Sequence, residues 1–242
     1  MGTTTRPAEI ELRDGRRLKL KLAVNPRARR VSVRIDAARG EAVATAPSER
    51  QVKRALNFAA ERAGWIEAEL ARLPTTQPFA PGAIVPIRGA PHLLILENGR
   101  RAPRFELGAW PGRLIVQTSD PDLFPARVKR FLAAQARADL AARVEAHAQT
   151  LGVRVKSIQV KETRSRWGSC AEDGALAFSW RLIFAPAFVL DYLAAHETAH
   201  IREMNHSRRF WALVAKCASR WREGRAWLHE HGATLHAIGR DA

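Results

Sequence analysis

Three histidines and one glutamate lie close together in the C-terminal half of the sequence. The segment from His196 to His200 reads His-Glu-Thr-Ala-His, and His206 follows six residues later. On an α-helix, two histidines four residues apart lie on one face, so both imidazoles can reach one metal ion. Glu197 would then lie beside the open coordination position as a general base. The pattern predicts hydrolysis in which metal-activated water attacks a carbonyl or phosphoryl centre.

The third metal ligand is the least constrained part of this pattern. His206 is favoured, but Glu223 and Glu230 on a later predicted helix are alternatives, because many zinc hydrolases use a glutamate there. Glu203 could also coordinate, although orientation of an imidazole is its favoured role. The step from His200 to His206 equals that of the metzincins. Glu203 replaces their glycine, however, and no Met-turn follows, which argues against a metzincin proper.

The residues around the motif predict the elements that position it. One stripe of a helix is indicated by residues that recur every four positions: Phe188, Tyr192, His196 and His200. Pro186 suits the first turn. Asn205 tolerates the left-handed conformation, so it is expected to end the helix and turn His206 towards the metal. Ser207 is the expected N-cap of a following helix over residues 208–220.

These motifs resemble those of the YgjP-like metal-dependent hydrolases, which are related to the SprT-like and Wss1-like proteases. The strongest similarity covers residues 191–200, 203–207, 210–211, 165–170 (Ser-Arg-Trp-Gly-Ser-Cys) and 178–182. Weaker similarity reaches residues 29–35, 46–47 and 63–66. Thr198 stands where the family usually has leucine, and Phe178-Ser179 where it often has leucine-asparagine. Neither departure touches the metal.

The resemblance implies a zincin-like catalytic domain with an active-site helix carrying H-E-x-x-H. It also implies one zinc ion held by His196, His200 and His206, with Glu197 as general base. Arg166 and Tyr192 are candidates to bind substrate and stabilise the oxyanion.

The segment from residue 153 to residue 180 is expected to form the wall of the cleft. Strands are predicted near residues 153–160 and 175–180, with turns at Gly168 and at Asp173-Gly174. Residues 161–166 are the expected edge, where substrate could add as a further strand. The competing interpretation is that Trp167 and Trp180 only fill the core. A nucleophilic Cys170 is disfavoured, because no activating histidine is evident.

Periodicity predicts an α+β protein with two regions. Residues 1–120 are expected to be mostly β: a hairpin around Asp14-Gly15, strands near residues 31–35 and 43, and one long helix with a buried stripe over residues 52–73. Residues 121–242 are expected to form the catalytic domain, opened by a helix from Pro125.

Composition limits the remaining possibilities. The chain has 242 residues, 46% of them hydrophobic, which is enough for a substantial core. A membrane-spanning run and a signal peptide are not evident, and two cysteines give no disulfide framework, so a cytoplasmic protein with no membrane partner is expected. The net charge of +16 is spread over both halves, so a solvated surface is favoured over nucleic-acid binding.

Three functions therefore remain open. The first is a zinc-dependent metallopeptidase acting on peptides. The second is a metal-dependent pyrophosphohydrolase of a nucleoside triphosphate or another phosphorylated small molecule. The third is a nucleic-acid-associated protein, either a DNA-associated protease or a module with structural zinc. Three convincing ligands argue against a closed structural site, which normally uses four.

Overall fold

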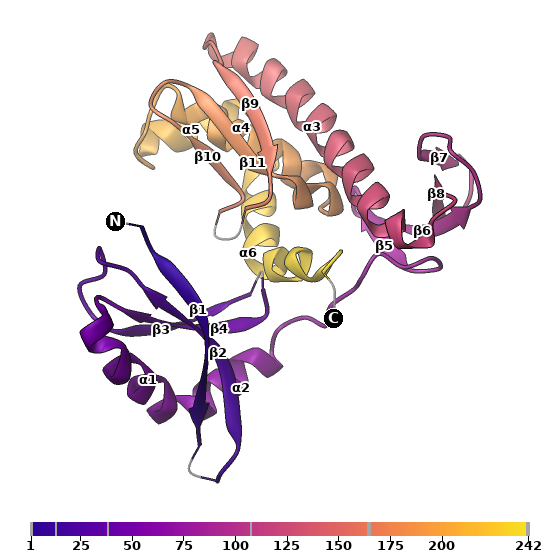
Figure 1. Cartoon of the computed structure of the whole chain (residues 1–242). Coiled ribbons are helices and arrows are strands. Elements are labelled where there is room, and N and C mark those ends of the chain that lie inside the picture. The colour runs from indigo at the N-terminus through magenta and orange to yellow at the C-terminus, as the bar shows by residue number, and fades with distance from the viewer. Residues whose placement is uncertain (1, 13, 38, 107, 164–165, 241–242) are drawn as a thin grey trace. The chain divides into compact units, whose positions relative to one another are not determined.

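The chain forms two compact units in the computed structural model, residues Met1–Pro74 and Thr75–Ala242 (Figure 1). The structure describes residues 2–12, 14–37, 39–106, 108–163 and 166–240. Both units combine strands and helices, so the α+β class expected from the sequence is confirmed.

Unit 1 contains a four-stranded sheet in the order β1-β2-β4-β3. Its strands are β1 (Thr4–Glu11), β2 (Arg17–Val24), β3 (Ser32–Asp36) and β4 (Glu41–Ala46). The expected hairpin joins β1 to β2, and Gly15 takes the left-handed conformation (φ 80°) that a residue without Cβ adopts easily. Strands β2 and β4 are parallel, and β3 pairs antiparallel with β4 alone, so β3 lies at one edge of the sheet.

The predicted long helix of unit 1 consists of two helices that meet at Arg62. They are α1 (Val52–Glu61) and α2 (Ala63–Ala71), preceded by a 3₁₀ turn, η1 (Glu49–Gln51). The predicted stripe packs on the sheet: Ala59 and Ile66 are fully buried beside Ala44 and Leu22. The opposite face of α1 is exposed.

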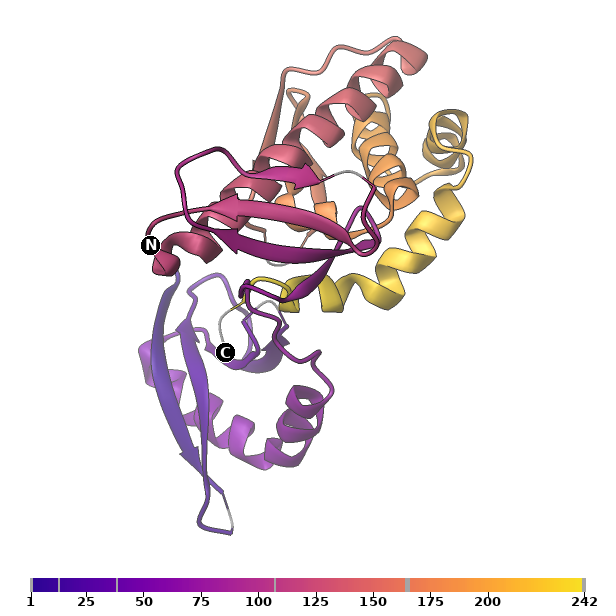
Figure 2. The same ribbon diagram turned by 90° about the vertical axis from the view of Figure 1, so that its right-hand side faces the viewer.

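Unit 2 begins with a second four-stranded sheet in the order β5-β6-β8-β7. Its strands are β5 (Ile84–Ile87), β6 (Ala90–Glu97), β7 (Arg104–Glu106) and β8 (Gly112–Gln117). A 3₁₀ turn, η2 (Pro121–Leu123), leads from β8 into the long helix α3 (Phe124–Leu151), and Figure 2 shows α3 running beside the sheet.

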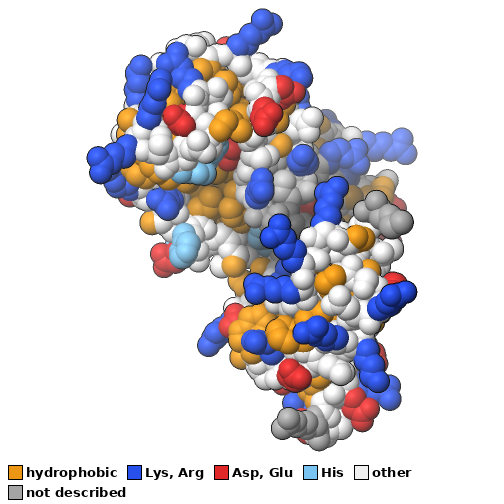
Figure 3. Space-filling view, turned by 90° about the vertical axis from the view of Figure 1, so that its left-hand side faces the viewer, with side chains coloured by type: hydrophobic (Ala, Val, Ile, Leu, Met, Phe, Trp, Pro, Cys, Tyr) orange, Lys and Arg blue, Asp and Glu red, His pale blue; other side chains and the backbone are white. Residues whose placement is uncertain are grey.

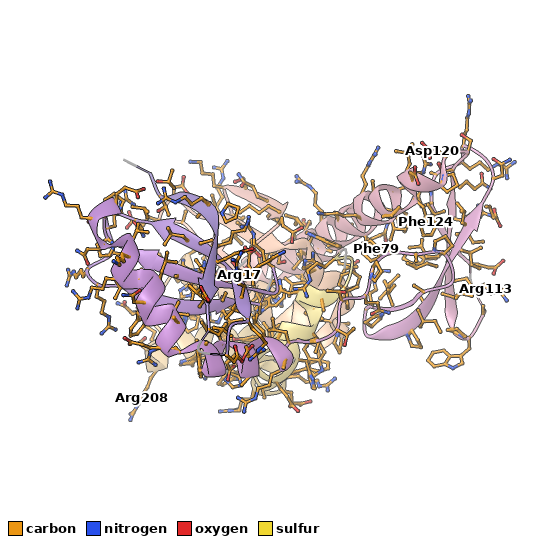
Figure 4. All side chains as sticks on the ribbon, turned by 60° about the horizontal axis from the view of Figure 1, so that its bottom comes forward. Arg17, Phe79, Arg113, Asp120, Phe124 and Arg208 are labelled. Atoms are coloured by element: carbon orange, nitrogen blue, oxygen red, sulfur yellow. The ribbon has the colours of Figure 1, made fainter. Side chains whose placement is uncertain are left out.

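The division at residue 74 differs from the expected boundary near residue 120. The reason is packing: Leu94 and Leu114 share one hydrophobic core with Leu132 of α3. Figure 4 marks Phe79 and Phe124, two further members of that core. The chain after Pro74 thus belongs to unit 2.

The second half of unit 2 is a small sheet followed by three helices. The sheet has the order β10-β11-β9, with β9 (Ser157–Lys161), β10 (Gly168–Cys170) and β11 (Ala175–Ser179). Gly168 begins a strand, so the turn expected there is wrong. A 3₁₀ segment, η3 (Trp180–Phe184), leads to α4 (Ala187–His200), α5 (Arg208–Cys217) and α6 (Trp221–Ala237). Among the described residues, no helix has the length and apolarity to span a membrane.

Candidate metal centre

Helix α4 contains the H-E-x-x-H motif and is largely buried in unit 2. Its N-cap is Pro186, and most of its residues from Val189 to His200 are buried against α3 and α6. Gly224 of α6 allows this close packing, since a Cβ there would lie 2.6 Å from Cβ of Tyr192. The motif is therefore held on a rigid, buried helix rather than on a loop.

The chain turns back after α4 and brings His206 over the helix. The helix ends at His200, followed by a turn at Ile201 and Arg202. Asn205 does not adopt a positive φ, so the expected left-handed stop is wrong. Ser207 does cap α5 as predicted, by accepting a hydrogen bond from the backbone N–H of Phe210 at 3.2 Å. Helix α5 ends at Cys217, earlier than expected.

The ring of Phe210 packs against all three imidazoles. It is fully buried, and its ring centroid lies 4.9 Å from His196, 4.5 Å from His200 and 4.7 Å from His206. Figure 4 shows Arg208, at the start of the same helix, pointing away from the protein. Because Phe210 belongs to α5, this packing links α5 to the loop that carries His206.

The three histidines point their Nε2 atoms at one another. His196 Nε2 lies 3.3 Å from His200 Nε2 and 3.1 Å from His206 Nε2. Two ligands of a tetrahedral zinc ion, each about 2.05 Å from the metal, are about 3.3 Å apart. Candidate ligand atoms of all three histidines lie within 4.8 Å of one another. The donor set and its spacing therefore fit a zinc ion.

Two of the three imidazoles are held in the neutral form that coordination requires. Burial, together with the charges of His200, His206 and Arg225, lowers the pKa of His196 to about 3. Burial also lowers the pKa of His200. Neutral imidazoles keep a lone pair for a metal.

Contacts to the second ring nitrogen orient two of the histidines. His200 donates through Nδ1 to the backbone carbonyl of Glu203 at 3.1 Å, which leaves its Nε2 free to coordinate. The hydroxyl of Tyr192 lies 3.5 Å from His196 Nδ1. Tyr192 is thus placed behind His196, and burial raises its pKa to about 12. Glu203 acts through its backbone, not its carboxylate.

The other candidate ligands lie outside the cluster. Glu223 forms an exposed ion pair with Arg220 at 2.6 Å, and Glu230 is exposed beside His231. Among the residues that the structure describes, the only group of three or more histidine, cysteine or acidic side chains close enough to share a metal is His196, His200 and His206.

Glu197 lies buried between α4 and strand β10. An ideal Cβ on Gly168 would come within 2.5 Å of Glu197 Oε1 and 2.7 Å of its Cγ, so only glycine leaves room for this side chain. Burial raises the pKa of Glu197 to about 8, and the charge of Arg166 opposes that increase. Arg166, the candidate for contact with substrate, is exposed and close enough for its charge to act on Glu197.

Cys170 and Trp167 lie near Glu197, but the structure gives neither of them a feature of a reacting group. Burial, with the charges of Glu197 and Asp173, raises the pKa of the Cys170 thiol to about 11, which makes it a weak nucleophile. Trp167 stacks on His236 of α6 with ring centroids 4.5 Å apart. Trp167 is a packing residue beside the site.

Arg225 is a charged residue of the site that the sequence analysis missed. It lies on α6, and its guanidinium is 4.9 Å from the ring centroid of Trp211. Its charge adds to the lowering of the His196 pKa and opposes the rise that burial causes in the Tyr192 pKa. It also lines a pocket of about 840 Å³ with Trp221. The sequence could not single out Arg225, because the chain contains many arginines and no local motif distinguishes this one from the others.

The sequence matches the YgjP-like metallopeptidase domain over residues 29–231, which includes the whole cluster. The chain belongs to the YgjP-like family. This membership makes it a metallopeptidase of the metal-dependent hydrolase class, and it confirms the resemblance drawn from the motifs.

Among curated proteins, none matches the chain. The metallopeptidase zymogen abylysin of Pyrococcus abyssi is 17% identical, with a TM-score of 0.34, over 38% of this chain and 93% of that chain.

A partly buried ion pair joins α3 to α4, the helix that carries the H-E-x-x-H motif of this YgjP-like domain. His147 of α3 is 6% exposed, and its Nε2 lies 3.0 Å from Oδ1 of Asp191 on α4. Burial lowers the pKa of His147, but the hydrogen bonds and charges of Asp191 and Cys217 outweigh burial and raise it to about 9. Protonated His147 therefore stabilises the fold below pH 6.5, its ordinary pKa, and this stabilisation is lost as the pH rises through 9.

Asp191→Asn is expected to destabilise the protein in a pH-dependent way. We expect the free energy of unfolding to fall by about 2 kcal/mol at pH 6 and by much less above pH 9, since the neutral imidazole gains little from the carboxylate. Denaturant unfolding at both pH values measures the difference. Glu145→Gln, an exposed change on α3, is the control. An equal loss at both pH values would contradict the role of the ion pair.

Proposed function

We propose that this protein is a zinc-dependent peptidase in which His196, His200 and His206 hold one zinc ion and Glu197 is the general base. The proposal rests mainly on the spacing of three Nε2 atoms: those of His200 and His206 lie 3.3 and 3.1 Å from that of His196. The buried carboxylate that follows His196 directly in α4 is its second support.

Each residue has a distinct chemical task in the proposed reaction. When bound, zinc supplies a Lewis acid that polarises the scissile carbonyl and makes water more acidic. Glu197 accepts the proton of the attacking water and passes it to the leaving amine. Tyr192 orients His196 through Nδ1, and Arg166, exposed beside Glu197, is the remaining candidate for contact with the developing oxyanion.

Strand β10 is the proposed binding edge for a peptide substrate. Among the described residues it pairs with β11 on one side only, and it packs against α4. An extended peptide can add to such an edge through backbone hydrogen bonds. The expected edge over residues 161–166 is partly outside the described residues, because positions 164 and 165 are not described.

A phosphorylated small molecule is the second candidate substrate. Arg225 acts electrostatically on His196, and Arg166 acts on Glu197, so two cations flank the cluster. Guanidinium groups bind phosphate oxygens well. A parallel screen of the wild type and Glu197→Gln against peptide and nucleotide libraries separates the candidates. Turnover of nucleotides alone would reject the peptidase, and turnover of peptides alone would reject the alternative.

Gly168→Ala is expected to lower kcat/KM by about 10- to 100-fold while the metal is retained. The added Cβ would collide with Glu197, whose side chain can move at little cost to the fold but not without leaving its catalytic position. Activity assays and elemental analysis measure the two effects. Ser169→Ala on the same strand is the control, and unchanged activity of Gly168→Ala would show that Glu197 has room to spare.

A further inference from the structure

Unit 1 contains an open groove that the proposed peptidase chemistry does not use. The groove has a volume of about 1050 Å³ and is lined by the edge strand β3 and by the exposed face of α1 and α2. Its positively charged side chains are Arg30, Arg50, Lys53, Arg54 and Arg62. We call this feature the cationic groove.

The charges of the cationic groove are not neutralised within the described part of unit 1. Its lysine and arginine side chains form no ion pair there, and Glu61 is the one acidic residue among those lining it. Six other arginines of unit 1 have acidic partners within 4 Å, whereas Arg27 and Arg29, which lie outside the groove, have none within the described residues. The paired arginines are Arg6, Arg16, Arg17, Arg34, Arg39 and Arg72. The groove is therefore the place where uncompensated positive charge is concentrated on a concave surface, which favours an anionic ligand.

Two aromatic side chains lie among these charges. Trp65 is 45% exposed, although its indole is large and mostly apolar, and Phe58 is half-buried. The guanidinium of Arg62 lies 4.5 Å from the ring centroid of Phe58. Figure 3 looks onto the side of unit 1 that carries α1 and β3, where blue Lys and Arg side chains flank orange apolar ones. Exposed rings between cations can stack on flat, unpaired bases.

The length of the cationic groove indicates a ligand with a chain of phosphates rather than a single phosphate group. Residues 50 to 62 span about 18 Å at the rise of a helix. Arg50 of η1, Arg54 of α1 and Arg62, which lies between α1 and α2, all line the groove along that span.

We propose that the cationic groove binds single-stranded nucleic acid, with Lys53, Arg54 and their neighbours on the phosphates and Trp65 stacked on a base. Duplex is disfavoured because its bases are already stacked and cannot reach the ring of Trp65. Net charge along the sequence could not reveal this, since it shows neither which cations are paired nor that strand β3 lies opposite α1.

Fluorescence anisotropy of the full chain with a labelled strand of about 15 thymidines tests the proposal. Lys53→Glu/Arg54→Glu is expected to weaken binding at least tenfold. It should also reduce the slope of log affinity against log salt by about 1.4, because two phosphate contacts are lost at about 0.7 each. Trp65→Ala is expected to weaken binding about tenfold, and Trp65→Phe to recover most of it.

The matched control is Lys19→Glu/Arg27→Glu. It makes the same charge change with the same residue types at exposed positions of unit 1 outside the groove. Thermal melts establish that each variant is folded. The proposal is overturned if the control weakens binding as much as the groove variant, or if Trp65→Ala has no effect. It is also overturned if duplex, inorganic triphosphate or an oligoglutamate peptide binds as tightly as the single strand.

Discussion

His206→Ala is expected to remove the metal from the purified protein and to lower kcat/KM by at least about 1,000-fold. The residue supplies one of three imidazoles, and its Nε2 lies 3.1 Å from that of His196. Two remaining ligands leave the zinc with too few protein donors for a stable site. His206 is exposed on the loop after α4, so its removal should leave the core and the fold intact.

Elemental analysis of the metal and activity assays on the same samples measure the two effects. His229→Ala is a matched control, because His229 is also an exposed histidine of unit 2 but lies outside the cluster. We expect wild type and His229→Ala to hold about one zinc per chain. A full equivalent of zinc in both His206→Ala and His196→Ala would reject the ligand assignment.

The part of the site that depends on local geometry could be predicted from the sequence. His196 and His200 share a face because helix periodicity alone places residues four apart together. Ser207 caps α5 because its side chain reaches the backbone N–H of Phe210, a contact three residues away. The hairpin at Gly15 has the same local origin. Each of these features is determined by fewer than about ten residues of sequence.

The parts that depend on distant segments could not be predicted in this way. Gly168 was interpreted as a turn residue, whereas its lack of a side chain makes room for Glu197, 29 positions along the chain. Arg225 reaches the cluster from α6. Strands β5 to β8 belong to unit 2 because they pack on α3, and their alternating pattern does not say which core they join. Tertiary packing, not propensity, decides these positions.

The return of His206 combines both kinds of information. The sequence suggested that the chain turns back, but it placed the turn at a left-handed Asn205. In the structure, the helix ends at His200, and Phe210 from the next helix packs under all three rings. The position of His206 thus depends on a buried aromatic residue more than on the residue that ends the helix.

Glu197→Gln is expected to retain the metal and to lower kcat by about 100- to 10,000-fold, with KM little changed. Glutamine has nearly the same shape, so it fits the space beside Gly168, but its amide cannot accept a proton from water. Because the change affects proton transfer and not coordination, zinc content should equal that of the wild type.

The matched control for Glu197→Gln is Glu203→Gln. Glu203 also lies beside the cluster, but it contacts His200 through its backbone carbonyl, which the substitution leaves in place. We therefore expect its kcat to stay within about twofold of the wild type, since no proton transfer depends on its carboxylate. Wild-type kcat in Glu197→Gln would remove the general-base role, whereas loss of zinc would show that the carboxylate supports coordination. A large fall in both variants would mean that negative charge near the cluster matters more than the position of one carboxylate.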